Sequence, residues 1–164
     1  RVVVSPVAQR ARVGLIERLY EVTNLVAEVS AASDALVKTF GLDPAPFVPI
    51  RSENYGYDGV LTLFQRGELD RVEIIHPFDA AKTMGRFFER AGPCLYMCFA
   101  ETDRPAEVRE RALAHAADHW TGPRDGDRPD NQFLHPRALG GVMLGVSRTT
   151  WAWSWSGAPE RIAP

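Results

Sequence analysis

The chain has 164 residues, of which 45% are hydrophobic and 24% charged, and its formal net charge is -2. This length and composition predict one globular domain that can bury its own core. The charge provides no basic surface for nucleic acid or for an anionic membrane, and no apolar run approaches the roughly 20 residues of a membrane-spanning helix.

Residues 1–18 are mixed and basic and show no regular period, so we interpret them as an arm or linker. Their one apolar run, residues 2–4, ends at Pro6 and is too short for the apolar part of a signal peptide. The two cysteines, Cys94 and Cys98, are too few for a disulfide framework and are expected to be small buried residues. These features together favour a cytoplasmic protein.

The next part of the chain is predicted to form a strand, a helix and three further strands. Apolar and β-branched residues predict the first strand over residues 20–29. A helix follows, with Ser30 or Ser33 as its N-cap and Gly41 as its C-cap. The three strands are then expected at residues 47–51, 60–65 and 71–76.

The second half of the chain repeats this order. A short helix over 79–90, closed by Gly92, leads into a strand at 94–100 and a helix from Pro105 to about His119. Residues 121–130 form a loop with room for a weak strand, and further strands are expected at 132–135 and 142–147. The repeat predicts an α+β fold of two βαβββ modules, about 19–91 and 92–150, whose curved mixed sheets surround a concave pocket. Residues 151–164 are a Trp-rich tail.

Three segments carry a resemblance to a known family: Val72–Pro77, Gly85–Arg90 and Phe133–Val142. They resemble the methylmalonyl-CoA epimerases and their glyoxalase-like relatives in the vicinal oxygen chelate superfamily, over roughly residues 19–147. The resemblance implies a pocket that holds a divalent metal. One ligand would come from near the start of each module and one from the last strand of each module.

In this sequence the four implied ligand positions fall on Asn24, Glu73, Met97 and Gly145. Only Glu73 suits a hard metal, which needs three or more histidine or carboxylate ligands. We therefore expect no metal and no cofactor, and no metal-dependent epimerase activity. Gly145 also removes one expected carboxylate base, for which Glu53 is a loosely aligned substitute.

Two functions remain open. In the first, the chain is a metal-independent isomerase or lyase that acts on a small carbonyl compound or an acyl-CoA. Glu73 would be the base, with a pKa raised by its apolar neighbours, and Asn24 or Tyr96 would donate a hydrogen bond to the developing oxyanion. The opposing interpretation of Glu73 is that it faces solvent or pairs with an arginine such as Arg71 or Arg86.

In the second function, the chain is a non-catalytic binding protein, comparable to the antibiotic-sequestering, bleomycin-resistance members of the superfamily. Met97 and Gly145 would then line a less polar pocket. Tyr55 and Tyr57 lie in a polar, aromatic segment that is either a ligand-binding rim or an ordinary surface loop.

The tail alternates Trp151, Trp153 and Trp155, which places all three rings on one face if the tail is extended. Packing or a dimer contact is favoured over stacking on a ligand, and a homodimer is expected. His115 and His119 have metal-capable spacing on a helix, but an exposed helical surface is the simpler interpretation.

Overall fold

The computed structural model describes residues 14–64, 69–116, 120–121, 131–155 and 160. Within these ranges no helix combines the length and the hydropathy needed to cross a membrane. The elements are, in chain order, β1 (Arg18–Leu25), α1 (Val29–Phe40), β2 (Val48–Ser52), β3 (Tyr57–Leu63), β4 (Arg71–Pro77), α2 (Thr83–Ala91), β5 (Cys94–Glu101), α3 (Pro105–Ala116), β6 (Trp120–Thr121), β7 (Asn131–Leu134), the short 3-10 helix η2 (Pro136–Ala138), β8 (Leu144–Ser147) and α4 (Thr149–Trp155).

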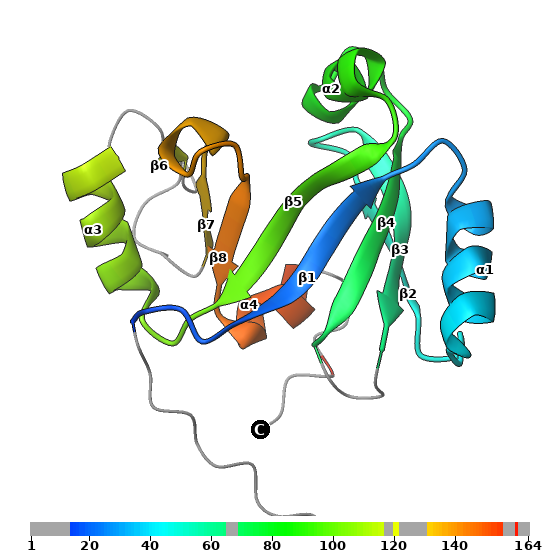
Figure 1. Ribbon diagram of the computed structural model, residues 1–164, viewed down its shortest axis with the longest axis horizontal. Helices are drawn as coiled ribbons and strands as arrows, with labels where there is room; N and C mark the ends of the chain where they lie inside the picture. Colours follow the sequence, from blue (N-terminus) through cyan, green and yellow to red (C-terminus); the bar gives the residue numbers. More distant parts are fainter. Residues whose placement is uncertain (1–13, 65–68, 117–119, 122–130, 156–159, 161–164) are drawn as a thin grey trace, which may run out of the picture.

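All the strands form one eight-stranded mixed sheet in the order β2-β3-β4-β1-β5-β8-β7-β6. Each half repeats the same pattern, because β1 pairs in parallel with β4 and β5 pairs in parallel with β8. Antiparallel pairing of β1 with β5 joins the halves. The sheet is curled, with α1 and α3 on its outside and α4 inside the curl (Figure 1). The prediction of an α+β fold of two βαβββ modules is confirmed.

The first strand is shorter than expected, because the chain leaves the sheet after Leu25 and α1 begins at Val29. Neither predicted serine caps this helix: the N-cap is Glu28, which makes no side-chain capping bond. The predicted end of the helix is confirmed. Gly41 adopts φ 64°, and its N–H donates to the carbonyl of Val37, a left-handed conformation that suits glycine.

Alternation along β1 and β4 divides their side chains between two faces. Glu21 and Thr23 of β1 contact Arg71 and Glu73 of β4 inside the curl, which we call the inner face. The alternate residues of both strands point to the outer face, where four of them line a groove beneath α1 together with Leu95 of β5: Val22, Asn24, Val72 and Ile74.

The main core lies on the inner face and includes α4. Leu61, Ile75 and Phe99 from the sheet pack in one cluster with Ala152 and Trp153 from α4. The described part of this segment is a helix and not extended, so the condition under which all three tryptophans would share one face is not met. A helix turns about 100° per residue, so Trp151 and Trp153 point in different directions instead of sharing one face. The side chain of Trp155 lies outside the described residues.

Candidate functional site

Glu73 is the centre of the buried polar cluster on the inner face. Its side chain is only 3% exposed, and the hydroxyl of Thr23 donates a hydrogen bond of 2.6 Å to its Oε2. The parallel pairing of β1 with β4 sets Thr23 directly beside Glu73. Among the described residues, the other carboxylate oxygen, Oε1, has no hydrogen-bond partner. A buried acceptor of this kind is available to a ligand.

Glu21 and Arg71 form an ion pair on the same two strands, two residues before Thr23 and Glu73. Arg71 Nε donates to Glu21 Oε2 at 2.5 Å, and both side chains are 0% exposed. Burying either charge alone would be costly, so each depends on the other. The guanidinium also lies near two aromatic rings, with Cζ 5.5 Å from the ring centre of Tyr20 and 5.3 Å from that of Trp153.

This environment raises the pKa of Glu73 to about 8. Burial is the main cause, and the negative charge of Glu21 adds to it, while the Thr23 hydrogen bond and Arg71 oppose it. Glu73 is therefore mostly protonated at neutral pH and can both donate and accept a proton near that pH. A carboxyl group with this property suits general acid–base chemistry.

Two tyrosines border the cluster. Tyr20 lies at an irregularity in the β1–β5 pairing, and its hydroxyl is 2.6 Å from Ser147 Oγ. Tyr57 begins β3 and packs against the inner core. Burial raises the pKa of Tyr57, and the charge of Glu73 raises it further, so its hydroxyl stays neutral and can donate a hydrogen bond.

Asn24 does not join Glu73. It lies half-buried in the groove beneath α1, on the outer face, because one residue along a strand reverses the direction of the side chain. The expected role of Asn24 beside an oxyanion therefore fails on geometry. Its neighbour Thr23 occupies the inner position.

Tyr96 and Met97 lie on β5, opposite β1. Tyr96 falls at a second irregularity in the β1–β5 pairing, and its ring meets that of Phe87 from α2 edge-on at 4.9 Å. Burial raises the pKa of Tyr96. Met97 is 7% exposed and pairs in register with Thr23, so it packs beside the polar cluster.

Gly145 gives space to an aromatic ring of the core. A Cβ atom added there would lie 2.2 Å from the ring of Phe99, its register partner across β5 and β8. The ring of Phe99 in turn lies 6.4 Å from that of Trp151. The predicted ligand-lining position is thus covered by protein.

Two other expected residues lie away from the cluster. Tyr55 is 49% exposed in the turn between β2 and β3. Glu53 is exposed and paired with Arg51 Nε at 2.7 Å, so it is not a second carboxylate of the buried site. His115 is exposed on α3, and its expected companion His119 lies outside the described residues.

Sequence reasoning missed Glu21 and Thr23, and it named Arg71 only as a possible partner of Glu73, whereas Arg71 pairs with Glu21. A signal was present, because polar residues two apart occur in both β1 and β4, and period-two spacing places them on one face. The parallel register that joins these two pairs could not be read from the sequence.

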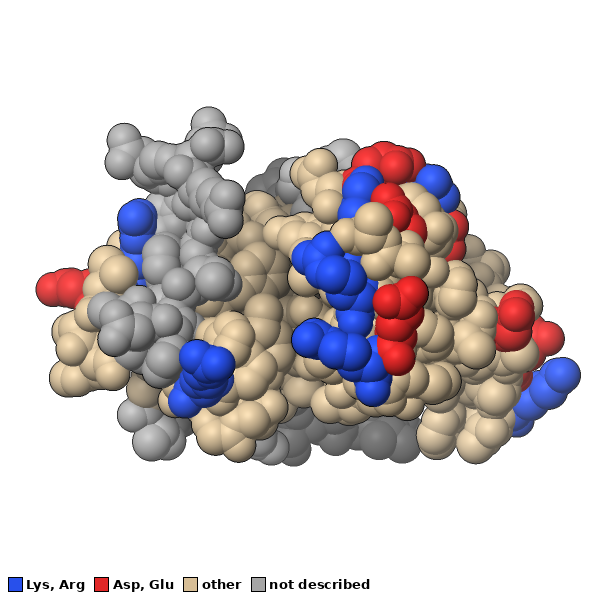
Figure 2. All heavy atoms as spheres, turned by 90° about the horizontal axis from the view of Figure 1, so that it is seen from above, with Lys and Arg blue, Asp and Glu red and all other residues tan. Residues whose placement is uncertain are grey.

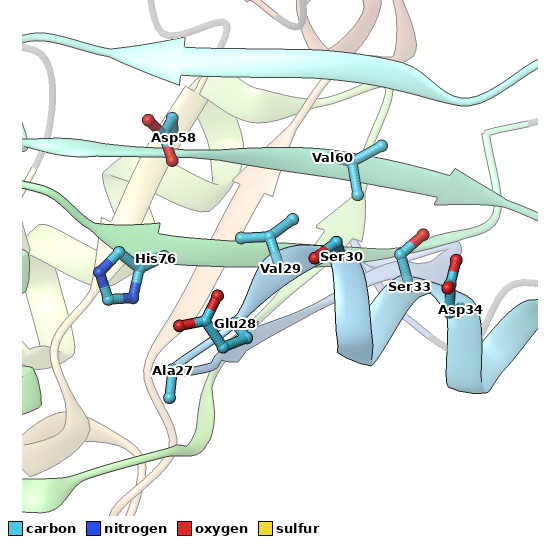
Figure 3. Close-up of a pocket in the computed structure, with 9 residues that line it drawn as sticks. All are labelled: Ala27, Glu28, Val29, Ser30, Ser33, Asp34, Asp58, Val60 and His76. Atoms are coloured by element: carbon cyan, nitrogen blue, oxygen red, sulfur yellow. The ribbon is translucent and has the colours of Figure 1, made fainter.

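The outer face carries a second, more open polar groove of about 610 Å³ between α1 and strands β3 and β4. Figure 3 shows Glu28 and His76 toward one end of this groove and Ser33 and Asp34 on the helix. Two of its polar groups have local partners: His76 Nδ1 is 2.9 Å from the carbonyl of Val26, and Asp58 pairs with Arg51 at 3.0 Å. This groove is a less reactive place than the inner cluster.

The inner face does not fit a divalent metal. In the described ranges, no three His, Cys, Asp or Glu side chains are grouped so that they could hold an ion. The two buried carboxylates share their cluster with the cation of Arg71, which already binds Glu21. Of the ligand positions that the resemblance implies in the second module, one holds the thioether of Met97, and the other, Gly145, is covered by the ring of Phe99.

No family model matches the sequence, and no curated protein matches it. Solved structures do match. Methylmalonyl-CoA epimerase from Mycobacterium tuberculosis aligns with a TM-score of 0.65 at 16% identity, covering 84% of this chain and 91% of that one. The Streptomyces coelicolor epimerase in complex with 2-nitronate-propionyl-CoA aligns with a TM-score of 0.62 at 16% identity, covering 82% and 96%.

A methylmalonyl-CoA epimerase in complex with methylmalonyl-CoA and NH4+ aligns with a TM-score of 0.60 at 17% identity, covering 83% of this chain and 96% of that one. At these identities the likeness concerns the fold. The chain therefore has the vicinal oxygen chelate fold, as the sequence segments predicted, and its inner face corresponds to the hollow of that fold.

Proposed function

We propose that this chain binds a small carbonyl compound or an acyl-CoA-like thioester on the inner face of its sheet and that Glu73 transfers a proton there without a metal. The observation that carries the proposal is Glu73 itself, a buried carboxyl with a pKa of about 8 and an Oε1 atom that has no hydrogen-bond partner among the described residues. Structural neighbours in complex with acyl-CoA-like molecules support the ligand class.

In the proposed step, the Glu73 carboxylate takes a proton from the carbon next to the carbonyl. The electrons of the broken C–H bond move to the carbonyl oxygen, which becomes an enolate, and Glu73 becomes neutral. The neutral hydroxyl of Tyr57 would donate a hydrogen bond to that oxygen, and Arg71 would favour its negative charge. Glu73 then exchanges its proton with solvent and returns a solvent-derived proton to the carbon, which restores both the carbonyl compound and the Glu73 carboxylate.

The surface around the hollow supports an anionic ligand. Figure 2 looks down on the end of the molecule where α2 lies, and Lys and Arg side chains gather there beside a hollow. Asp and Glu side chains lie beside these cations, so the Lys and Arg residues offer local charged partners for the phosphates of a CoA-like molecule and not a uniformly positive rim.

The test is hydrogen–deuterium exchange at the α-carbon of propionyl-CoA in D2O, followed by NMR, with metal chelated throughout. The unmodified protein should catalyse the exchange. Glu73→Gln should slow it by about 10²-fold or more with little change in affinity, since general acid–base groups contribute that much. Asn24→Ala, on the outer face, is the matched control and should exchange at the normal rate.

Propionyl-CoA binding without exchange would instead support the second candidate, a sequestering protein. The apolar second half of the inner face, with Met97, Phe99 and Trp151, favours that alternative. Absence of both binding and exchange would overturn the proposed ligand class.

We also propose a homodimer and a cytoplasmic location. Leu19 and Leu95, 61% and 64% exposed, lie on the two central strands and supply apolar surface for a second copy. Light scattering should then give a dimer, and Leu95→Glu should yield monomers. The free thiols of Cys94 and Cys98 suit a reducing compartment.

A further inference from the structure

The helix α4 lies directly over the buried charges of the inner face. Ala152 is 0% exposed and Trp153 is 2% exposed, and the Trp153 ring lies 5.3 Å from the guanidinium carbon of Arg71. Trp151, on another side of the same helix, is next to Phe99 in the second half of the sheet. The helix therefore contacts both halves of the sheet from inside the curl (Figure 1).

Tertiary contacts hold α4 in place. The helix has only seven residues, and isolated helices shorter than about 12 residues are marginal in water. Its position thus depends on burying Ala152 and Trp153 against the sheet. A short element held by a few side chains can undock while the rest of the fold stays intact.

Beneath α4 the site is incomplete. Oε1 of Glu73 is buried without a hydrogen-bond partner among the described residues, a costly arrangement for a carboxyl that only supports the fold. The two grooves described above lie on the outer face, away from Glu73. Arg71 and Glu73 lie two residues apart on the inner face of β4, so a ligand that reaches Glu73 from the side of Arg71 has to take space that α4 occupies.

We propose that α4 is a built-in competitor for the inner-face site and that a ligand with a flat conjugated group binds by replacing the Trp153 ring over Arg71. This inference rests on the proposed function for the location of the site. A guanidinium is weakly hydrated and stacks on aromatic faces, so a ligand ring restores the contact that the departing indole gives up. A saturated ring of the same size restores only part of it.

The competition has a measurable consequence. A ligand that binds only the undocked form has its affinity reduced by the fraction of molecules in that form. Removing the Trp153 ring raises this fraction and tightens binding. A variant that keeps an aromatic ring at position 153 leaves the affinity nearly unchanged.

The experiment uses 2-naphthoate as the probe and decahydronaphthalene-2-carboxylate, its saturated analogue, as the comparison. Titration calorimetry gives Kd for the unmodified chain, Trp153→Ala, Trp153→Phe and Leu113→Ala, whose side chain is 46% exposed on α3. Trp153→Ala should bind 2-naphthoate on the order of 10-fold more tightly, as expected if about one molecule in ten is undocked. The other two variants should match the unmodified chain, and the saturated analogue should bind more weakly throughout.

Hydrogen exchange on the unmodified chain provides a second measurement that does not depend on the folding of Trp153→Ala. Saturating 2-naphthoate should speed amide exchange in a peptide covering residues 149–155. Equal Kd values with and without the indole, slower exchange in that peptide, or equal binding of both probes would overturn the inference.

The two proposals fail separately. If 2-naphthoate does not speed amide exchange in α4 but propionyl-CoA still shows Glu73-dependent exchange, the proposal that α4 competes for the site is wrong and the proposed function stands. If 2-naphthoate displaces α4 and propionyl-CoA shows no exchange, the competition by α4 is supported and the proposed proton transfer is wrong. The inner face then binds a ligand without reacting with it.

Discussion

In the first half of the sheet, parallel strands β1 and β4 set Thr23 beside Glu73, whereas in the second half parallel strands β5 and β8 set Phe99 beside Gly145. The backbone pairing is the same in both halves. The inner side chains are not: the first half buries the Glu21–Arg71 ion pair and Glu73, and the second packs Met97, Phe99 and Phe133.

The difference shows that a repeated backbone does not fix the chemistry of the face that it encloses. Strand pairing uses main-chain groups, so it tolerates charged residues in one half and aromatic residues in the other. The buried charges need partners within their own half, and Glu21 and Arg71 meet that need in adjacent strands. The result is a one-sided inner face, with the buried carboxyls and Arg71 in one half and an apolar wall in the other.

The largest expected effect comes from making the charged half resemble the apolar one. Arg71→Met leaves Glu21 buried without its partner and should lower the free energy of unfolding by about 3–5 kcal/mol, measured by urea denaturation. The double variant Glu21→Leu/Arg71→Met removes both charges and should recover most of the loss. A double variant as unstable as the single one would show that packing around Arg71 matters more than charge.

A smaller effect should appear in the pH dependence of stability. The pKa of Glu73 is raised from 4.5 to about 8, so between these values the unfolded chain loses a proton that the folded chain keeps. Stability should therefore be complete below about pH 4.5 and fall as the pH rises toward 8, by on the order of 2–4 kcal/mol. Denaturation of the unmodified chain and Glu73→Gln at pH 5 and pH 8 isolates this contribution, since the amide does not titrate. An equal change in both proteins would assign the pH dependence to other groups.

The smallest effect tests the apolar half. Gly145→Ala places a methyl group against the Phe99 ring and should cost about 1–3 kcal/mol, because Tyr20, Phe133 and Trp151 surround that ring. Combined with Phe99→Leu, the substitution should cost less than the sum of the two single changes. Strict additivity would mean that the ring moves aside freely.

Local patterns in the sequence predicted the elements and the repeat. Period-two and period-3.6 spacing predicted the strands and helices from β1 to β8 to within a few residues, and Gly41 marked a real helix end, but the helix α4 was not predicted. The boundary between β1 and α1 was missed, because the end of β1 is set by its pairing with β4, whose last backbone hydrogen bond runs from the N–H of Val26 to the carbonyl of Ile75, and no local pattern encodes that pairing.

The candidate site was only partly predictable. Glu73 could be selected because a lone carboxylate among apolar strand residues is unusual. The residues that surround Glu73 could not be selected, because an error of one residue in strand register exchanges the two faces of the sheet. The sequence alignment made that error and selected Asn24 in place of Thr23. The partner of Arg71 is separated from it by 50 residues in sequence.

By itself, then, the sequence determined that the chain repeats a βαβββ unit, because the repeat follows from residue type and spacing. Only the tertiary structure decided which strand neighbours share the inner face, that Glu73 is buried beside Glu21, and that the tryptophans form a helix over Arg71. The physical reason is that strand register and the docking of a short helix depend on contacts between residues far apart in the chain.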